Sequence, residues 1–159
     1  MKLLIVDDEE LIRNVIKEYA KLENYEVDEA EDGDAAIEKA LSKDYDVIVM
    51  DIMMPKRDGF SAIREIKKIK DIPVIVLSAR TMEEDKLNGF DLGIDDYVIK
   101  PFSPKELIAR IKAVTKRQKG EDIISVGTIK LNNLTREVSI NDEIIELTHT
   151  QFELLKLFL

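Results

Sequence analysis

Short runs of apolar, mostly branched residues alternate with segments of helical spacing, and this alternation restricts the fold more than any other feature of the sequence. Three of the runs are Leu3–Val6, Val47–Met50 and Val74–Leu77. Runs of this kind are typical of parallel strands that are covered on both faces of a sheet. Tyr25–Asp28 alternates apolar and polar residues, as an edge strand does, and Asp96–Ile99 is a fifth candidate strand.

Apolar residues recur at helical spacing between and after these runs. The segments are 11–22, 36–41, 63–69, 82–92 and 107–114. The last of them begins with Ser103–Glu106, which combines a capping box with proline at the first helical position. Five repeats of strand and helix predict an α/β fold with a doubly wound, five-stranded parallel sheet in the order 2-1-3-4-5.

Polar residues directly follow four of the predicted strands, at the edge where ligands bind in doubly wound sheets. They are Asp7, Asp8, Asp51, Ser78 and Lys100. Three carboxylates repel one another unless a cation or protons neutralise them, and Mg²⁺ (or Mn²⁺) suits a few carboxylates with waters and a phosphate oxygen. A carboxylate can also be the nucleophile toward phosphorus, a reaction that needs mainly positioning and charge neutralisation. The alternative, in which these residues merely cap helices or end strands, suits a single aspartate better than all five residues together.

These five residues sit in a wider pattern. Met54–Pro55 and Asp58–Gly59 follow the third aspartate, and Pro101–Phe102 follows the lysine. The pattern resembles the receiver domain of two-component response regulators over residues 1–118, which implies a flavodoxin-like receiver fold. It also implies that a sensor histidine kinase, or a small acyl phosphate, supplies the phosphoryl group. Because such receivers phosphorylate and dephosphorylate themselves only slowly, we expect a signalling switch and not an enzyme.

The resemblance also implies roles for single residues. Asp51 is the expected phosphoacceptor, with Lys100 and Ser78 contacting the phosphoryl oxygens; many receivers have threonine at the position of this serine. Tyr97 is the expected partner of Ser78 in a side-chain switch, although a lone tyrosine is more often a partly buried aromatic of an edge strand. A cis peptide bond is expected between Lys100 and Pro101.

The expected metal ligands follow from the same resemblance. Asp8 would bind the cation directly, Asp7 largely through water, and Asp51 and the backbone carbonyl of Met53 would complete the protein ligands. Met53 also argues against a phosphatase of the haloacid-dehalogenase type. Such an enzyme uses an aspartate nucleophile with Mg²⁺ and needs a second acidic residue two positions after it, where this chain has Met53. A nucleotide-binding switch is disfavoured because the sequence has no glycine-rich loop that ends in Lys-Ser or Lys-Thr. An interaction module without phosphorylation is disfavoured because it would not need all three aspartates together with Lys100.

The chain continues with shorter strand-like segments separated by turn-forming residues. The segments are 124–127, 129–131, 136–140 and 143–147. Thr148–Gln151 then has capping-box spacing before an apolar helix. This part resembles the start of the winged-helix effector domain of the OmpR/PhoB subfamily, with an antiparallel β segment and a partial helix at 123–159 and a linker at 119–122.

The resemblance places Leu159 inside the first helix of that effector domain, before the recognition helix. Since the second helix of a helix-turn-helix module reads the bases, we expect DNA binding only when the missing part is present. The apolar face of Phe152, Leu155 and Phe158 would lack its partners. We therefore expect a tail that is poorly ordered or that pairs with another chain.

The subfamily resemblance further implies a homodimer formed through the fourth helix, the fifth strand and the fifth helix. The charged residues expected on that face are Lys86, Asp95, Asp96, Glu106, Arg110 and Arg117. Lys86 with Glu106, and Asp96 with Arg110, are candidate pairs across the dimer. The alternative is an ordinary solvated surface, where ion pairs contribute little to stability.

Composition excludes several other functions. The chain has no cysteine and one histidine, His149, so a disulfide framework, a thiol nucleophile and a zinc site of cysteine and histidine are excluded. The net charge of −9 offers no basic face for nucleic acid. No stretch has the length of a membrane span, so we expect a soluble cytoplasmic protein. His149 lies in a helix-cap sequence, and a phosphohistidine donor is therefore expected on a partner protein.

Overall fold

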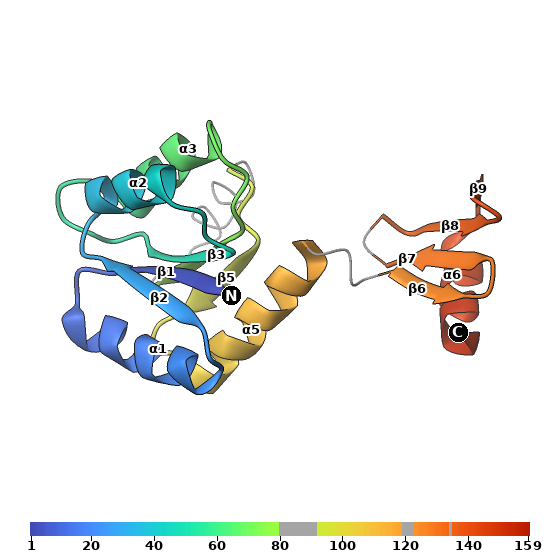
Figure 1. Cartoon of the computed structure of the whole chain (residues 1–159), viewed down its shortest axis with the longest axis horizontal. Helices are drawn as coiled ribbons and strands as arrows, with labels where there is room; N and C mark the ends of the chain where they lie inside the picture. Colours follow the sequence, from blue (N-terminus) through green and yellow to red (C-terminus); the bar gives the residue numbers. More distant parts are fainter. Residues whose placement is uncertain (80–91, 119–122, 134) are drawn as a thin grey trace. The chain divides into compact units, whose positions relative to one another are not determined.

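The computed structural model describes residues 1–79, 92–118, 123–133 and 135–159. It divides the chain into two compact units, Met1–Thr115 and Lys116–Leu159 (Figure 1). The expected linker at 119–122 lies outside the described residues. None of the helices in the described ranges has the length and the apolar character that crossing a bilayer requires.

The first unit contains a parallel sheet in the order β2-β1-β3-β4-β5, which confirms the predicted topology and the α/β fold class. Its strands are β1 (Lys2–Val6), β2 (Glu26–Ala30), β3 (Val47–Asp51), β4 (Val74–Ser78) and β5 (Asp96–Ile99). The edge strand β2 extends two residues beyond the predicted Asp28. The reason is its register, which pairs Glu26 through Ala30 with the whole of β1.

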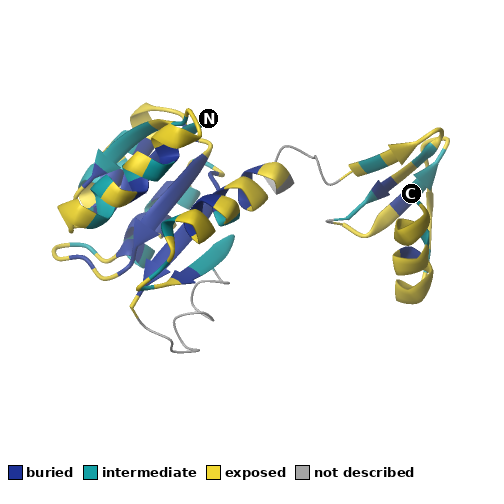
Figure 2. Ribbon diagram, turned by 90° about the horizontal axis from the view of Figure 1, so that it is seen from below, coloured by how far each residue is buried: buried dark blue, intermediate teal, exposed yellow. Residues whose placement is uncertain are grey.

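Helices cover both faces of this sheet. They are α1 (Glu10–Leu22), α2 (Gly33–Ser42), α3 (Gly59–Lys67) and α5 (Pro104–Gln118). Figure 1 shows α1 and α5 on one face of the sheet and α2 and α3 on the other, and Figure 2 shows the strands between them coloured as buried. Successive strand residues point to opposite faces, so Leu3 and Ile5 pack beneath α1 and α5, and Leu4 and Val6 beneath α2 and α3. The predicted helix at 82–92 falls almost entirely outside the described residues.

Side-chain caps begin three of the helices just beyond the strand ends. The Asp32 carboxylate accepts from the N–H of Ala35 (2.8 Å), and the Asp58 carboxylate accepts from the N–H of Ser61 (2.9 Å). The Ser103 hydroxyl accepts from the N–H of Glu106 at 3.4 Å, as the capping spacing predicts. Such caps satisfy backbone N–H groups that the first helical turn leaves without partners.

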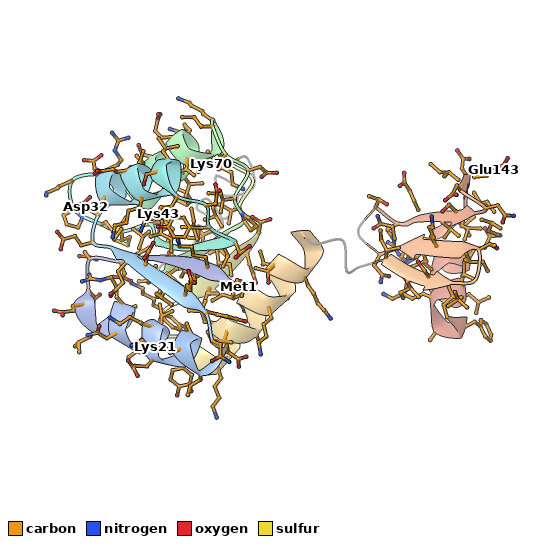
Figure 3. All side chains as sticks on the ribbon, viewed as in Figure 1. Met1, Lys21, Asp32, Lys43, Lys70 and Glu143 are labelled. Atoms are coloured by element: carbon orange, nitrogen blue, oxygen red, sulfur yellow. The ribbon has the colours of Figure 1, made fainter. Side chains whose placement is uncertain are left out.

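Charged side chains line the outside of the first unit (Figure 3). Lys70 is one that joins two elements: its ammonium donates to the backbone oxygen of Lys43 (3.0 Å) and to the Asp44 carboxylate (3.1 Å). This contact ties the segment after α3 to the turn before β3. Most of the other ion pairs of this unit are half-exposed and contribute little to its stability.

The second unit is an antiparallel sheet in the order β6-β7-β8-β9, followed by one helix. Its elements are β6 (Ile123–Val126), β7 (Ile129–Asn132), β8 (Glu137–Ile140), β9 (Glu143–Ile145) and α6 (His149–Phe158). The predicted capping box of Thr148 and Gln151 begins α6, and His149 is exposed at its first position.

A small core holds this second unit together. Phe152 is buried against Leu131 and Val138, and Leu155 packs at the edge of the same cluster. The expectation that Phe152 and Leu155 lack packing partners is therefore wrong for the described residues, because the sheet supplies these partners. Pairing of the tail with another chain stays a prediction. Of the three residues in the predicted apolar face, only Phe158 is exposed to solvent, at 80%.

Candidate functional site

Three aspartates meet at the carboxyl edge of the parallel sheet. Asp7 and Asp8 follow β1 and Asp51 ends β3, and each offers one carboxylate oxygen within 4.8 Å of the others. Asp7 is fully buried and Asp51 nearly so, whereas Asp8 is exposed. Buried carboxylates this close together need a cation or protons to offset their repulsion. The oxygen-only donor set suits a hard divalent cation such as Mg²⁺.

Backbone N–H groups orient the two buried carboxylates. Asp7 Oδ1 accepts from the N–H of Glu9 (2.9 Å), and Asp51 Oδ1 accepts from the N–H of Met53 (3.0 Å). In both residues the second oxygen, Oδ2, is then left to face Lys100. The turns after β1 and β3 therefore fix the direction of each carboxylate.

Lys100 joins these carboxylates from the end of β5. Its Nζ donates to Asp7 Oδ2 at 2.9 Å and lies 3.3 Å from Asp51 Oδ2. The backbone N–H of Lys100 donates to the carbonyl oxygen of Ser78 (2.8 Å), which holds the lysine beside the end of β4. The peptide bond between Lys100 and Pro101 is cis, as predicted.

The charges of this cluster do not balance. Burial raises the pKa of Asp51, and the nearby Asp7 carboxylate raises it further, against the opposite effects of the Met53 N–H and Lys100. Burial alone lowers the pKa of Lys100, but its contacts with Asp7 and Asp51 outweigh burial and raise this pKa overall. One ammonium thus faces two buried carboxylates and an exposed third, which leaves negative charge for a cation to neutralise.

The remaining predicted residues lie around this cluster. Ser78 is fully buried at the end of β4, on the strand between Asp51 and Lys100 in the sheet. Met53 is half-exposed in the loop after β3. Tyr97 pairs with Val76 across β5 and β4, and its ring packs against the core beneath α2 and α3. The structure thus brings the five predicted strand-end residues to one edge, whereas Tyr97 lies on β5, three residues before Lys100.

Sequence reasoning missed Arg13 and Glu29. Arg13 lies on α1, where its Nη1 donates to the backbone oxygen of Asp7 (2.8 Å) and its Nε lies 3.4 Å from the Glu29 carboxylate. An arginine on a helix and a glutamate on an edge strand are usually solvated, so neither residue type gave a signal. The sequence signal that existed is spacing, since Arg13 lies within two helical turns of Asp7.

The predicted dimer face is only partly described. Lys86 and the rest of 80–91 lie outside the described residues, as does the side chain of Arg117, whose backbone belongs to α5. Asp95 accepts from the N–H of Val74 (2.9 Å) in its own chain.

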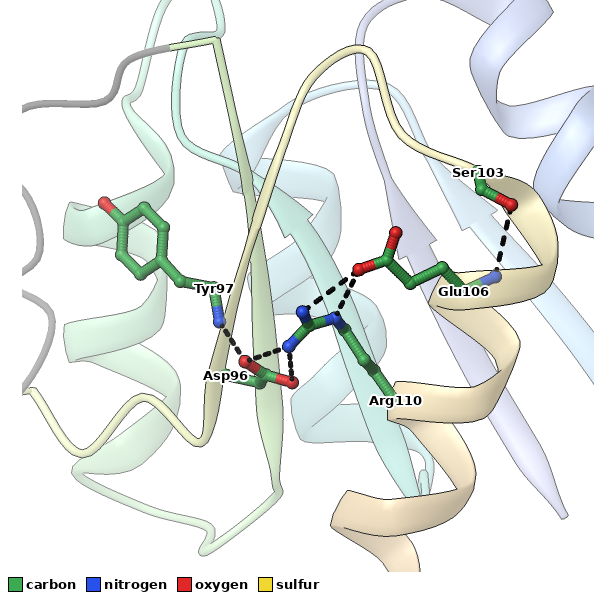
Figure 4. A network of polar contacts seen from close by, with 5 residues as sticks. All are labelled: Asp96, Tyr97, Ser103, Glu106 and Arg110. Carbon is green, nitrogen blue, oxygen red and sulfur yellow. Dashed lines mark hydrogen bonds and ion pairs between the residues drawn. The ribbon is translucent and has the colours of Figure 1, made fainter.

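Arg110 also has partners within its own chain (Figure 4). Its Nη1 lies 3.0 Å from both oxygens of Asp96, and its Nη2 lies 3.0 Å from Glu106 Oε1. A cross-subunit pair between Asp96 and Arg110 would have to replace this contact. Figure 4 shows the ring of Tyr97 pointing away from the network, while its N–H donates to Asp96.

Comparison with known proteins agrees with this geometry. The sequence-family model of the response regulator receiver domain matches residues 3–112 of the chain. The chain belongs to the response regulator family. This response regulator is 38% identical to the transcriptional regulatory protein ResD of Bacillus subtilis, over 97% of its own length and 68% of the length of ResD.

Solved structures agree on the fold and the subfamily. Response regulator DrrB of Thermotoga maritima, an OmpR/PhoB homologue, superposes with a TM-score of 0.67 at 29% identity, covering 98% of this chain and 70% of DrrB. TrrA of Thermotoga maritima, solved in complex with Mg²⁺ and BeF, has a TM-score of 0.64 at 38% identity, covering 71% of this chain and 97% of TrrA. The predicted family and the OmpR/PhoB subfamily are confirmed.

Proposed function

We propose that this response regulator accepts a phosphoryl group on Asp51 from a sensor histidine kinase, or from a small acyl phosphate. The observation that carries the proposal is the state of the Asp51 carboxylate. It is buried at the sheet edge, with one oxygen held by the Met53 N–H and the other beside Lys100. A preorganised carboxylate next to a fixed cation is what in-line phosphoryl transfer requires.

The proposed step is a simple exchange at phosphorus. A carboxylate oxygen of Asp51 forms a bond to phosphorus while the bond from phosphorus to the donor atom breaks. The donor, a histidine nitrogen or acetate, leaves with the electron pair of that bond, and the product is an acyl phosphate on Asp51. Lys100 would stabilise charge on the phosphoryl oxygens, and the Ser78 hydroxyl would donate a hydrogen bond to one of them.

The acidic set fits Mg²⁺ or Mn²⁺. Asp7, Asp8 and Asp51 would hold the cation, together with the carbonyl oxygen of Met53. A bound divalent cation would supply charge neutralisation and alignment of the phosphoryl oxygens. The Mg²⁺ complex of TrrA supports this assignment. The product marks a signalling state, so we treat the chain as a switch with slow chemistry of its own and not as an enzyme.

The histidine kinase would bind beside this site. A depression of about 510 Å³ is lined mainly by apolar side chains of α1 and the β5–α5 loop, with Lys100 at its side. Leu11 and Val15 project into solvent there, at 78% and 43% exposure. Contiguous exposed apolar patches can mark protein–protein interaction sites. A partner protein seated on this surface would bring its phosphohistidine close to Asp51.

We assign residues 1–118 to the receiver and 123–159 to the amino-terminal part of a winged-helix domain, joined at 119–122. The four-stranded sheet before α6 and the likeness to DrrB along nearly the whole chain support the second assignment. DNA binding is proposed only for a chain in which a recognition helix follows α6. The relative ResD, a transcriptional regulatory protein, supports this role.

Phosphorylation would act by shifting an equilibrium toward a homodimer. The proposed face comprises the helix predicted at 82–92 together with β5 and α5. The Ser78–Tyr97 switch would link this face to Asp51. The hydrogen bond from the backbone N–H of Tyr97 to Asp96 supports this link, because a shift of the Tyr97 backbone would act on a member of the Arg110 network.

Intact-mass spectrometry tests the phosphoacceptor proposal. The chain is incubated with acetyl phosphate, with and without Mg²⁺, beside the Asp51→Asn variant. One phosphoryl adduct is expected on the unchanged chain, dependent on Mg²⁺ and absent from the variant. A folded, unchanged chain that stays unmodified in Mg²⁺ would overturn the proposal and leave a receiver-shaped interaction module.

A further inference from the structure

Arg13 binds the backbone of the two aspartates that follow β1. Its Nη1 donates to the carbonyl oxygen of Asp7 at 2.8 Å and reaches that of Asp8 at 3.4 Å. The Arg13 side chain is only 14% exposed, and its contact with Asp7 is partly buried, whereas the longer contact with Asp8 is exposed. One side chain from α1 thus holds both residues of the β1–α1 turn from which two of the three carboxylates project.

Glu29 on β2 lies beside the other edge of the guanidinium, at ion-pair distance. Its Oε1 lies 3.4 Å from Arg13 Nε, and its Oε2 lies 2.9 Å from Lys17 Nζ. The hydrogen bond from Lys17 holds the pKa of Glu29 below its ordinary value against the opposing effect of burial, so Glu29 is ionised at neutral pH. The planar guanidinium therefore lies between a charged anchor on the edge strand and the turn that carries the aspartates.

We propose that Arg13 is a positioning residue for the cation site, acting through the carbonyl groups of Asp7 and Asp8. This inference rests on the proposed function, because it takes these aspartates as metal ligands. Arg13 itself would not be a ligand of the cation, because its guanidinium donates to backbone oxygens of the turn. It holds the backbone of the β1–α1 turn in place. The position of this backbone determines where the side chains of Asp7 and Asp8 start. Groups that orient metal ligands in this way usually change metal affinity strongly when they are removed.

Two effects of Arg13 on cation binding have opposite signs. As a positive charge near the site, Arg13 repels a cation, so its removal would strengthen binding if charge alone mattered. As the residue that holds the turn, Arg13 preorganises the Asp7 and Asp8 carboxylates, so its removal would weaken cation binding. The sign of the change in cation affinity therefore separates a positioning role from a role as a background charge.

Mn²⁺ binding to the full chain, followed by the electron paramagnetic resonance signal of free Mn²⁺, measures that sign. Arg13→Gln is expected to weaken Mn²⁺ binding by about tenfold. Arg13→Lys keeps the charge but loses the planar fork, and it is expected to weaken binding as well. Lys17→Gln is the matched control, since it removes the other cation on Glu29 without touching the turn, and it should bind Mn²⁺ at least as tightly as the unchanged chain.

A second measurement uses no metal and remains useful if a variant is destabilised. The N–H of Glu9 donates to Asp7 Oδ1 and reports on the geometry of the turn. Its hydrogen exchange should be faster in Arg13→Gln and Arg13→Lys than in Lys17→Gln, relative to the global unfolding rate of each variant.

Unchanged or tighter Mn²⁺ binding in both folded Arg13 variants would overturn the positioning role while leaving the cation site intact. Absence of Mn²⁺ binding by the unchanged chain would overturn the cation site and the positioning role together. Normal Mn²⁺ binding without phosphorylation of Asp51 would count against the proposed function alone.

Discussion

A Cβ atom at Gly59 would lie 2.3 Å from the carbonyl oxygen of Asp51. The next nearest atoms are also backbone, with Ile52 Cα at 2.7 Å, so no side chain can move aside. The N–H of Gly59 donates to the carbonyl oxygen of Ile52 (3.1 Å), which holds the first residue of α3 against the end of β3. Glycine at this position lets the helix approach the strand end that carries the proposed phosphoacceptor.

Gly59→Ala should therefore destabilise the first unit and slow its phosphorylation. The added methyl group must push the strand end or the helix away, at a cost of about 1–3 kcal/mol. The higher helix propensity of alanine recovers at most about 1 kcal/mol. Gly33→Ala is the milder comparison, since Gly33 is the first residue of α2 and the three atoms nearest to an added Cβ belong to the Arg57 side chain, at 3.1 to 3.2 Å, so a shift of a few tenths of an ångström would relieve the contact. Denaturant unfolding of both variants tests this, and equal stabilities would contradict it.

The pair of Tyr45 and Asp28 should make stability depend on pH. The Tyr45 hydroxyl donates to Asp28 Oδ2 at 2.6 Å. This bond lowers the pKa of Asp28 below its ordinary value of 3.8, although burial acts to raise it. A depressed pKa means that the stabilisation is complete above 3.8 and is lost as the pH falls through the lower, folded-state value.

Tyr45→Phe should lower the free energy of unfolding by about 1–2 kcal/mol at neutral pH, and by less as the pH falls well below 3.8. Lys43→Ala, which removes a more exposed partner of Asp28 at 3.4 Å, should change it by less than about 1 kcal/mol. Urea unfolding at a series of pH values measures both. A Tyr45→Phe deficit that stays constant across the acid range would show that the hydrogen bond is not the cause.

The Arg110 network offers a test of the proposed dimer by mixing. Arg110→Asp and Asp96→Arg each place like charges at both ends of the pair, within one chain and between identical chains. A mixture of the two variants restores opposite charges only across a heterodimer. After phosphorylation, we expect each variant alone to sediment as a monomer and the mixture to associate.

Lys112→Ala is the control for that experiment, because Lys112 is exposed on the same helix but pairs with Glu23 at the end of α1. It should associate like the unchanged chain. If phosphorylated Arg110→Asp forms dimers on its own, Arg110 does not belong to the interface.

Phe152→Ala should unfold the second unit and leave the first unit intact. Phe152 is the one helical residue among the buried core of Leu131, Val138 and Phe152, and removing such a ring costs about 3–5 kcal/mol. A unit of this size has little stability to lose. In amide NMR spectra the signals of β6–β9 should collapse toward random-coil positions while those of β1–β5 stay dispersed. Retention of the β6–β9 signals would mean that the sheet is stable without this helix.

The strand-end residues could be predicted because parallel strands deliver their carboxyl ends to one edge. Asp7, Asp51 and Lys100 are far apart in sequence, yet topology alone brings them together, and the apolar runs before them fix the topology. Arg13 could not be predicted in this way. Its role depends on two carbonyl oxygens of the turn, and backbone groups leave no trace in the residue types of a sequence.

Two further differences have physical causes of the same kind. The sequence predicted a helix over 11–22 from its apolar spacing, but Ile16 is buried while Leu11 and Leu22 are exposed, because the helix presents only part of its apolar surface to the sheet. The tail was expected to lack packing partners, yet β7 and β8 supply them to Phe152. The sequence pattern identified the elements, and contacts between elements distant in sequence decided which surfaces were covered.

Reductive mapping of the phosphorylated residue tests the central claim most directly. Borohydride reduces an acyl phosphate on aspartate to homoserine, so peptide mass spectrometry after treatment with acetyl phosphate and Mg²⁺ identifies the residue that carried the group. We predict homoserine at position 51 and nowhere else, and none when Mg²⁺ is omitted. A phosphorylated, folded chain in which the reduced residue is another carboxylate, with Asp51 unchanged, would contradict the account.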